Sequence, residues 1–233
     1  MGKRIIQQAR GKGSLTYRVR RKAYRFRVSY PSLSGCGKII KLINSPAHST
    51  PLAKIKIGNE IFYNVAVNGV YEGQIIEIGE NATIKEGNII PLEKLPIGTE
   101  ICNIETIVGN GGKLVRSSGT SAKIVKRTSA GVIVLLPSKK EKLFSFKARA
   151  TVGVVAGSNR VEKPILKAGK KYHIMKARNK FWPRTSAVKV NVVDHPFGSG
   201  RGKRIKSKIA KKGAPPGRKV GLLRPRRAGR RKR

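Results

Sequence analysis

The sequence predicts a mainly β protein, made of two small β-barrels with a long basic extension at each end. The 233 residues leave room for two domains, because domains usually hold about 100 to 150 residues. Between residues 38 and 157, short runs of β-branched residues are separated by Gly, Pro and Asn. Both ends of the chain are rich in Arg, Lys and Gly and lack apolar periodicity. The expected divisions are a basic extension at 1–34, barrels at 35–108 and 109–190, and a basic extension at 191–233.

The N-terminal extension, residues 1–34, offers too little apolar surface to fold alone. We therefore expect it to stay disordered until it lies against a negatively charged partner. Four aromatic residues stand among its basic ones: Tyr17, Tyr24, Phe26 and Tyr30. These rings can stack on nucleic-acid bases, or they can anchor the extension to the folded part of the chain. The sequence leaves both interpretations open.

The first barrel is predicted from five β-branched runs: KIIKLI, LAKIKIGNEIFYNVAV, QIIEIG, NIIPL and EICNIETIV. In LAKIKI, Leu and Lys alternate with Ala and Ile, which is the period of two expected of a half-buried strand. Gly58 and Asn59 then predict a hairpin turn. Five runs over about 70 residues fit a small closed barrel of the oligonucleotide-binding type.

A glycine-rich turn, GNGGKLVRSSG at residues 109–119, separates the two barrels. Asn110, Gly111 and Gly112 are expected to supply the positive φ angles of a tight connection. Four runs follow, AKIVKR, GVIVLLPS, KLFSFKA and ATVGVVAG, and their polar positions are basic. They predict a second small barrel with one rim or face toward phosphate.

Residues 162–179 predict one or two short helices after the second barrel. Pro164 suits the first turn of a helix, because proline has no N–H to leave unpaired there. Gly169 suits a break between helices.

Charge identifies the class of partner. The chain has 52 Lys and Arg against 11 Asp and Glu, a formal net charge of +41, which is strongly self-repelling unless a polyanion neutralises it. Residues 1–59 contain 14 basic and no acidic side chains, whereas residues 60–105 contain 2 basic and 8 acidic ones. Residues 106–190 contain 20 and 2, and residues 191–233 contain 16 and 1. We expect the basic parts to face nucleic acid and residues 60–105 to face solvent or another protein.

Other classes of protein are disfavoured by missing signals. A polybasic membrane protein needs an apolar span, a lipidation signal or an amphipathic basic helix, and the sequence has none of these. No signal peptide is recognisable either, so the expected location is the cytoplasm. Cys36 and Cys102 are too few for a disulfide scaffold or a zinc site, and we interpret them as ordinary thiols.

Two short motifs resemble parts of known reactive sites, but neither matches one. GNGGK lacks the spacing of a nucleotide-binding loop, and an RNA-binding loop in which Lys113 contacts phosphate is favoured. Asp194 precedes His195, but neighbours on an extended strand point in different directions, so the pair is not a carboxylate-oriented base. His195 is the only catalytic candidate, and we interpret it as a turn-stabilising side chain. The surrounding cations are expected to lower its pKa and keep the ring neutral.

Three functional classes share this charge. An RNA-binding protein of a large particle is favoured. A DNA-compacting or single-strand-binding protein would share the charge and the barrels. An RNA-processing enzyme would need carboxylate pairs or metal ligands, which the sequence does not present. Trp182 has two interpretations, a core residue beside Pro183 or a contact to RNA.

Several segments resemble one known family. GKRIIQQARGKGS, GNGGKLVRSSGTSA, KARATVGVVAG, EKPILKAG, KARNKFWPR, NVVDHPFG and APPGRKVG are similar, in this order and spacing, to the large-subunit ribosomal protein L2 family in its archaeal and eukaryotic form. The similarity covers almost the whole chain. The resemblance implies an oligonucleotide-binding-like barrel followed by an SH3-like barrel, with basic extensions ordered by ribosomal RNA. It implies no enzyme, but a structural protein near the peptidyl transferase centre that supports subunit assembly and joining and tRNA binding.

The chain departs from the family pattern at two glycine-rich places. Ser199 interrupts Gly198 and Gly200, and Ser158 and Asn159 follow Gly157, where the family usually has glycines. The family commonly reads Arg-Gly-Val-Ala-Met-Asn before the Asp-His-Pro, and residues 184–191 differ from that pattern. The core Asp-His-Pro motif is intact.

The resemblance also implies the partners and contact residues. The expected partners are large-subunit rRNA, other ribosomal proteins, the small subunit at its interface and, indirectly, tRNA, with no membrane and no small-molecule substrate. No cofactor or metal site is expected in the protein, although magnesium bound by the rRNA can lie nearby. The candidate rRNA-binding residues are Lys3, Arg4, Arg10, Lys12, Arg18, Arg20, Arg21, Lys113, Arg116, Lys147, Arg149, Arg178, Trp182, Arg184, Asn191, Asp194, His195, Arg201, Lys203, Arg204, Arg218, Lys219, Arg226, Arg227 and Arg230.

Overall fold

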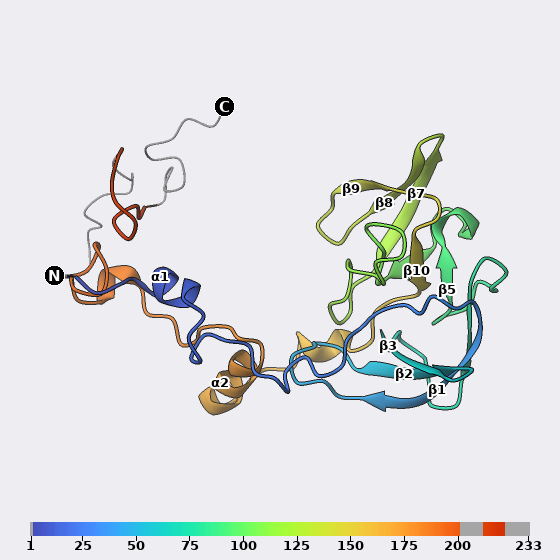
Figure 1. Ribbon diagram of the computed structural model, residues 1–233, viewed down its shortest axis with the longest axis horizontal. Helices are drawn as coiled ribbons and strands as arrows, with labels where there is room; N and C mark the ends of the chain where they lie inside the picture. Colours follow the sequence, from blue (N-terminus) through green and yellow to red (C-terminus); the bar gives the residue numbers. More distant parts are fainter. Residues whose placement is uncertain (1, 201–211, 222–233) are drawn as a thin grey trace. The chain divides into compact units, whose positions relative to one another are not determined.

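The computed structural model describes residues 2–200 and 212–221, and it confirms a mainly β protein (Figure 1). Within the described residues the chain forms two compact units, one from residues up to 19 and from 179 onward, the other from residues 20–178. The first unit contains the helix α1 Ile6–Gly11 and the 3-10 helix η3 Ala187–Lys189. The second contains the helix α2 Ala168–Ala177 and the 3-10 helices η1 Leu92–Lys94 and η2 Ser158–Arg160. It also contains the strands β1 Gly35–Ile43, β2 Leu52–Ile57, β3 Glu60–Val65, β4 Ile75–Ile78, β5 Ile89–Pro91, β6 Glu100–Cys102, β7 Ala122–Thr128, β8 Gly131–Leu135, β9 Glu141–Phe144 and β10 Arg149–Val152.

The strands of the second unit share one sheet, in the order β3-β2-β1-β4-β5-β10-β6-β7-β8-β9. β10 lies between β5 and β6 and pairs antiparallel with both. β6 precedes the predicted boundary at residue 108, and it pairs with β7 and β10, which follow that boundary. Backbone hydrogen bonds therefore connect the two halves of the unit, and the division into two barrels stays a prediction.

The hairpin predicted at Gly58 and Asn59 is confirmed. β2 and β3 pair antiparallel along their whole length on either side of this turn, and Gly58 has a φ of 53°, a conformation that favours glycine. In β2 the Ala and Ile residues are buried while Lys56 is exposed, as the period of two predicts. Leu52 is also completely buried, because the start of the strand lies against a second apolar cluster.

Buried apolar side chains form three clusters in the second unit. One centres on β6 and β7 through Ile101 and Ile124, and another on β1 and β2 through Ile39 and Ile55. A third, smaller cluster includes Leu52 and the completely buried Cys102. Full burial of one such aliphatic side chain contributes about 1.5 to 3 kcal/mol, so the three clusters stabilise the second unit.

Residues 20–34 differ from the expectation that the whole N-terminal extension lacks structure. Val28 and Tyr30 are buried, and Val28 pairs with Tyr63, so this segment runs beside β3 (Figure 1). The ring of Phe26 lies 4.9 Å from that of Tyr63. Phe26 and Tyr30 therefore anchor the extension, which settles for these two rings what the sequence left open.

The helix predicted within residues 162–179 is confirmed as the single helix α2. Gly169 lies inside α2 and does not break it, because a single glycine costs a helix only about 0.5 to 1 kcal/mol relative to alanine. Pro164 precedes the helix and does not open it. No residue of α2 is buried.

The two thiols differ in their surroundings. Cys36 is exposed, whereas burial raises the pKa of Cys102 to about 12, so this thiol stays protonated and unreactive. Among the described residues, no three His, Cys, Asp or Glu side chains gather as metal ligands would. None of the helices in residues 2–200 and 212–221 has the length and apolar content to cross a bilayer.

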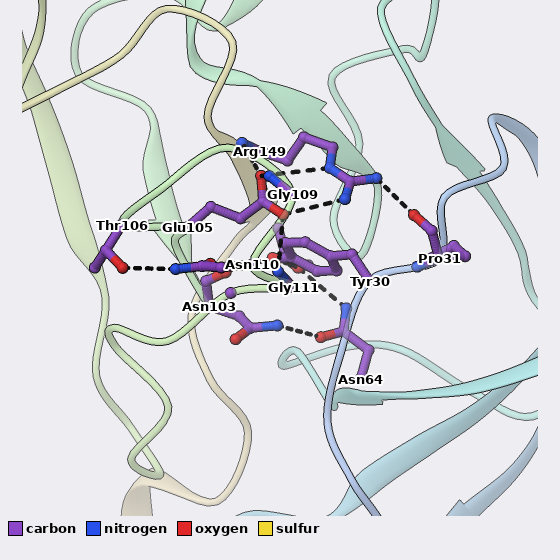
Figure 2. A network of polar contacts seen from close by, with 12 residues as sticks. Tyr30, Pro31, Asn64, Asn103, Glu105, Thr106, Gly109, Asn110, Gly111 and Arg149 are labelled. Atoms are coloured by element: carbon purple, nitrogen blue, oxygen red, sulfur yellow. Dashed lines mark hydrogen bonds and ion pairs between the residues drawn. The ribbon is translucent and has the colours of Figure 1, made fainter.

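The carboxylate of Glu105 is the centre of a buried polar network (Figure 2). The guanidinium of Arg149 donates to it from Nη2 at 3.1 Å and from Nε at 3.4 Å, and the backbone N–H of Arg149 donates at 3.0 Å. The Arg149 side chain is only 18% exposed, and its Nη1 donates to the carbonyl oxygen of Pro31 at 2.7 Å. The ion pair thus connects β10, the turn after β6 and the segment before β1.

The glycine-rich turn at residues 109–119 folds around the same carboxylate. The backbone N–H groups of Gly109 and Gly111 donate to Glu105 at 3.3 and 3.0 Å. Positive φ angles occur at Gly109, Gly111 and Gly112, and Asn110, expected to have one, does not. A Cβ on Gly112 would lie 2.4 Å from the carbonyl oxygen of Asn103, so only glycine fits there. The turn that resembles a phosphate-binding loop holds a carboxylate of its own chain.

The balance of forces keeps Glu105 ionised. Burial by itself would raise the pKa of this carboxyl, but the hydrogen bonds from Arg149 and Gly111 and the charge of Arg149 outweigh burial. The pKa of Glu105 is therefore below its ordinary value. A carboxylate that is more acidic when folded stabilises the fold wherever it is ionised.

Tyr30 extends the network toward β3. Its hydroxyl donates to the carbonyl oxygen of Asn103 at 2.6 Å and lies 2.8 Å from the hydroxyl of Thr151. The side-chain amide of Asn103 donates to that of Asn64 at 2.9 Å (Figure 2). The Arg149 guanidinium lies 5.4 Å from the centre of the Tyr30 ring, a cation–π distance. Burial raises the pKa of Tyr30, which keeps its hydroxyl a donor.

We expect Glu105→Gln to lower the free energy of unfolding by about 3 to 5 kcal/mol, because it leaves the partly buried charge of Arg149 without a counterion. The matched control is Glu100→Gln, whose carboxylate lies 3.9 Å from Lys123 at the exposed surface. This control should cost about 0 to 1 kcal/mol. Urea unfolding of the two variants measures the difference, and equal losses would contradict the role of Glu105.

The same pair predicts a pH dependence. Because the pKa of Glu105 is below its ordinary value of 4.5 in the folded protein, its stabilisation is complete above that pH and is lost as pH falls through the lower folded pKa. The stability difference between wild type and Glu105→Gln should therefore stay constant at neutral pH and shrink below 4.5. Urea titrations at a series of pH values measure it. A difference that persists unchanged in strong acid contradicts the expected linkage.

Candidate nucleic-acid interface

Most predicted RNA-binding cations are exposed, and they occur in both units. Those of the first unit are Lys3, Arg4, Arg10, Lys12, Arg18, Arg184 and Arg218, and those of the second are Arg20, Arg21, Lys113 and Lys147. Asn191 and Asp194 are exposed as well, whereas Arg178, Trp182, His195 and Lys219 are half-buried. The remaining predicted residues, Arg201, Lys203, Arg204, Arg226, Arg227 and Arg230, lie outside the described residues.

Two predicted cations point into the protein. Arg149 is the partner of Glu105. Arg116 donates from Nε to the side chain of Asn103 at 2.6 Å and from Nη2 to the carbonyl oxygen of Val28 at 3.2 Å. Nη2 also donates to the carbonyl oxygens of the glycine-rich turn. Both guanidinium groups thus have internal roles, and their contact with RNA stays a prediction.

The first unit brings distant parts of the sequence together. The backbone N–H of Lys3 donates to the carbonyl oxygen of Val193 at 2.8 Å, which joins the N-terminal segment to the loop that contains His195. The rings of Tyr17 and Phe181 lie 6.4 Å apart. By sequence, Asp194 is the only acidic residue of this unit. Exposed cations from both ends of the chain therefore occupy one unit with almost no internal counterion.

The loop at residues 190–200 is a closed turn. The backbone N–H groups of Asp194 and Gly198 donate to the carbonyl oxygens of Asn191 and His195, at 3.0 and 2.8 Å. A Cβ on Gly198 would lie 2.4 Å from the carbonyl oxygen of Asn191, so this close approach requires glycine. Ser199 has a φ of 71°, in the region where the family's usual glycine is favoured. These bonds close the loop around His195.

The hydrogen bonding of His195 decides its chemistry. The backbone N–H of Phe197 donates to its Nδ1 at 3.0 Å, so the proton of the neutral ring is on Nε2. Its ring lies 5.1 Å from that of Phe197. Burial lowers the pKa of His195, so the expected lowering is confirmed, although the cause is burial and not the surrounding cations. The Nε2–H can donate to a phosphate or a base, and no ring nitrogen is left to accept a proton.

Asp194 does not act on the ring of His195. Its side chain is exposed, and the hydrogen bonds of the described residues include none between these two side chains. Trp182 is half-buried and belongs to none of the three apolar clusters of the second unit.

The sequence prediction omitted the exposed lysines of α2. Lys170 and Lys176 are exposed, and Lys176 lies 5.3 Å from the centre of the Tyr172 ring. The signal was available, because AGKKYHIMKA has no acidic residue and no apolar stripe that would bury one face.

Comparison with known proteins agrees with this geometry. Residues 85–215 match the family described as Ribosomal Proteins L2, C-terminal domain. The chain is 44% identical over 235 residues to the large ribosomal subunit protein uL2 of Archaeoglobus fulgidus, covering 98% of this chain and 99% of that one. It is 46% identical over 238 residues to the uL2 protein of Hyperthermus butylicus, covering 100% of both. The chain therefore belongs to the ribosomal protein L2 family of the large subunit, in its archaeal-type form.

Proposed function

We propose that this chain binds large-subunit rRNA near the peptidyl transferase centre, and that it supports subunit assembly and joining, tRNA binding and peptide-bond formation by the RNA. Family membership gives the coarser part, a structural protein of the large ribosomal subunit in the cytoplasm and not an enzyme. The finer part is argued from the first unit and from the loop at residues 190–200.

One observation carries the proposal. Lys3, Arg4 and Arg10 are exposed cations of the first unit, the backbone of Lys3 is bonded to Val193 of the His195 loop, and by sequence Asp194 is the unit's only acidic residue. Such a surface is unfavourable alone and becomes favourable when phosphates replace the missing carboxylates. Phosphate contacts of this kind hold a protein in place and carry little sequence information. Specificity would come from the shape of the RNA around the closed loop.

His195 would act by position. Its Nε2–H is a donor of fixed direction, held by the Phe197 backbone, and a donor suits a phosphate oxygen or a base acceptor. A general base needs a free lone pair at the reacting proton, and the Nδ1 lone pair is already used. The protein would therefore support the RNA's chemistry without taking part in it.

The acidic segment, residues 60–105, is suited to contacts with solvent or other proteins and not with RNA. Of the eight glutamates in residues 60–105, only Glu105 is buried, and the others face outward or are half-exposed. We propose that this side of the second unit lies away from phosphate, toward solvent or other ribosomal proteins, and that contacts with the small subunit and tRNA arise from the chain's place in the particle. Magnesium near the protein would be held by the rRNA.

Gradient sedimentation of a cell extract tests the proposal against its alternatives. Co-migration with the large subunit that survives moderate salt supports it. Migration with DNA, or as free protein, would favour a DNA-binding role. An equilibrium competition between large-subunit rRNA and duplex DNA of equal phosphate content provides the matched control.

We expect the affinity of the free protein for rRNA to fall steeply with salt, because each phosphate contact releases counterions. Removal of residues 201–233, which contain 16 of the 52 Lys and Arg, should make the plot of log affinity against log salt less steep. Filter binding over a range of salt concentrations measures both slopes. Identical slopes would show that this segment makes no phosphate contacts.

We expect His195→Gln to lower the yield of correctly joined subunits, because it loses a positioned hydrogen bond worth about 1 to 2 kcal/mol. Particles that do assemble should form peptide bonds within about tenfold of the normal rate, since a general base contributes about 10² to 10⁴ in rate. Single-turnover peptidyl transfer on purified particles measures this. A loss of about 10³ in well-assembled particles, with the pH dependence abolished, would make His195 a participant in the chemistry.

A further inference from the structure

An apolar groove lies on the solvent-facing side of β1, β2 and β4. It has a volume of about 310 Å³, and Cys36, Ile40 and Ile75 line it together with Lys38 and Lys56. Ile75 is 67% exposed and Ile40 is 43% exposed, although isoleucine is among the residues most often buried. Apolar side chains that gather in an exposed patch with a polar rim indicate an interaction site, whereas scattered ones do not.

The pairing of the strands sets the walls of this groove. Ile75 of β4 pairs with Lys38 of β1. Lys38 also pairs with Lys56 of β2, which in turn pairs with Ile61 of β3. Residues that are paired in this way have their side chains on the same face of the sheet, so these four form one row across the strands. A β-bulge leaves Ile40 without a partner in β2, and bulges redirect side chains in this way at binding sites.

The lysines of this face lack negative partners. β1 and β2 contain four lysines and no acidic residue. Lys38 lies directly opposite Lys56, and like charges that face each other across two strands are destabilising. Neither of them forms an ion pair within residues 2–200 and 212–221. The carboxylate of Glu77 on the adjacent strand β4 instead accepts hydrogen bonds from the backbone N–H and the hydroxyl of Thr83.

The chemistry of the groove favours a protein partner over RNA. Sites for nucleic acid are typically built from arginine forks and from aromatic rings on which bases stack. Neither kind of side chain lines the groove among the described residues, and the sequence has no arginine between Arg27 and Arg116. An aliphatic groove accepts an apolar side chain, and the two lysines beside it attract carboxylates.

We propose that this groove binds a segment of another protein of the large subunit. The segment inserts an apolar side chain between Ile40 and Ile75. Its neighbouring Asp or Glu residues pair with the two lysines of the row, Lys38 and Lys56. The inference rests on the proposed function, because the particle supplies the partner. Residues 201–233 contain no acidic side chain and a second copy of the chain carries a charge of +41, so repulsion opposes both as occupants.

The reactivity of Cys36 measures whether the groove is occupied. In the free full-length protein this exposed thiol should react with N-ethylmaleimide, whereas the buried Cys102 should not. In purified large subunits the reaction of Cys36 should be at least about tenfold slower, because the reagent reaches the thiol only when the partner moves away. Mass spectrometry of the peptide that contains Cys36 measures both rates, and equal rates would overturn the proposal.

A second measurement identifies the occupant. Carbodiimide joins a lysine amine directly to a carboxylate, and it does not join the amine to a phosphodiester. In treated large subunits, Lys38 or Lys56 should become linked to an Asp or Glu of another ribosomal protein. Protection of Cys36 with neither lysine linked to another protein would overturn the proposal. A link to a second copy of this chain, or ultraviolet cross-links between β1 and rRNA, would also overturn it and would assign the groove to that occupant.

Two exposed isoleucines provide a matched pair of variants. Ile75→Ser removes apolar surface from the groove, whereas Ile97, which is 62% exposed, does not line the groove and Ile97→Ser is the control. Both free variants should unfold at the wild-type temperature, because substitutions of exposed residues hardly change stability. In large subunits, Ile75→Ser should lower the yield of the carbodiimide link by about tenfold, as the loss of one anchoring contact does.

Cys36 should at the same time become as reactive in Ile75→Ser subunits as it is in the free protein, while Ile97→Ser subunits should behave as wild type. Equal behaviour of the two variants would contradict the proposal. If the chain is absent from the large subunit, the proposed function fails. If it is present and Cys36 of the wild type reacts as in the free protein, only the inference about the groove fails.

Discussion

The buried carboxylate of Glu105 is the interaction on which the rest of the fold depends. In a chain of net charge +41, acidic side chains that can pair with a buried cation are few. Glu105 lets three segments meet by accepting the guanidinium of Arg149 and the amides of Gly109 and Gly111. A buried ion pair of this kind adds little net stability against a well-packed apolar core, but losing one partner is costly. In this protein the pair of Glu105 and Arg149 determines which segments of the chain pack together.

Acidic and basic side chains have different roles in this protein. The one buried glutamate connects distant segments of the second unit, and the other glutamates of residues 60–105 lie at its surface. The first unit has exposed cations from both ends of the chain and only Asp194 to oppose them. Glu105 therefore orders the protein internally, while unpaired cations and the fixed donor on His195 are left for a polyanion. A glycine-rich loop that looks ready for phosphate is already filled by the chain's own carboxylate.

The sequence predicted the strands well and the polar contacts poorly. Period-two patterns such as residues 52–57 depend on neighbours in the chain, so β2, its hairpin and most other strands were found where expected. Contacts between distant residues leave no local signal. Arg149 and Arg116 look like the other basic residues until Glu105 and Asn103 are placed beside them. The sequence could not predict that Tyr30 anchors the N-terminal extension either, because its hydrogen-bond partners lie 73 and 121 residues away in the chain. At His195 the expected neutral ring was right, although burial and not charge is the cause.

Ultraviolet cross-linking of purified large subunits, followed by mass spectrometry of the peptides attached to RNA, tests the central claim most directly. If acidic side chains order the protein and unpaired cations bind RNA, cross-links should lie in residues 2–18 and 181–200, beside Lys3 and the His195 loop. Residues 60–100, with their outward glutamates, should yield none or few. Cross-links concentrated in residues 60–100, with the His195 loop unmodified, would contradict the account.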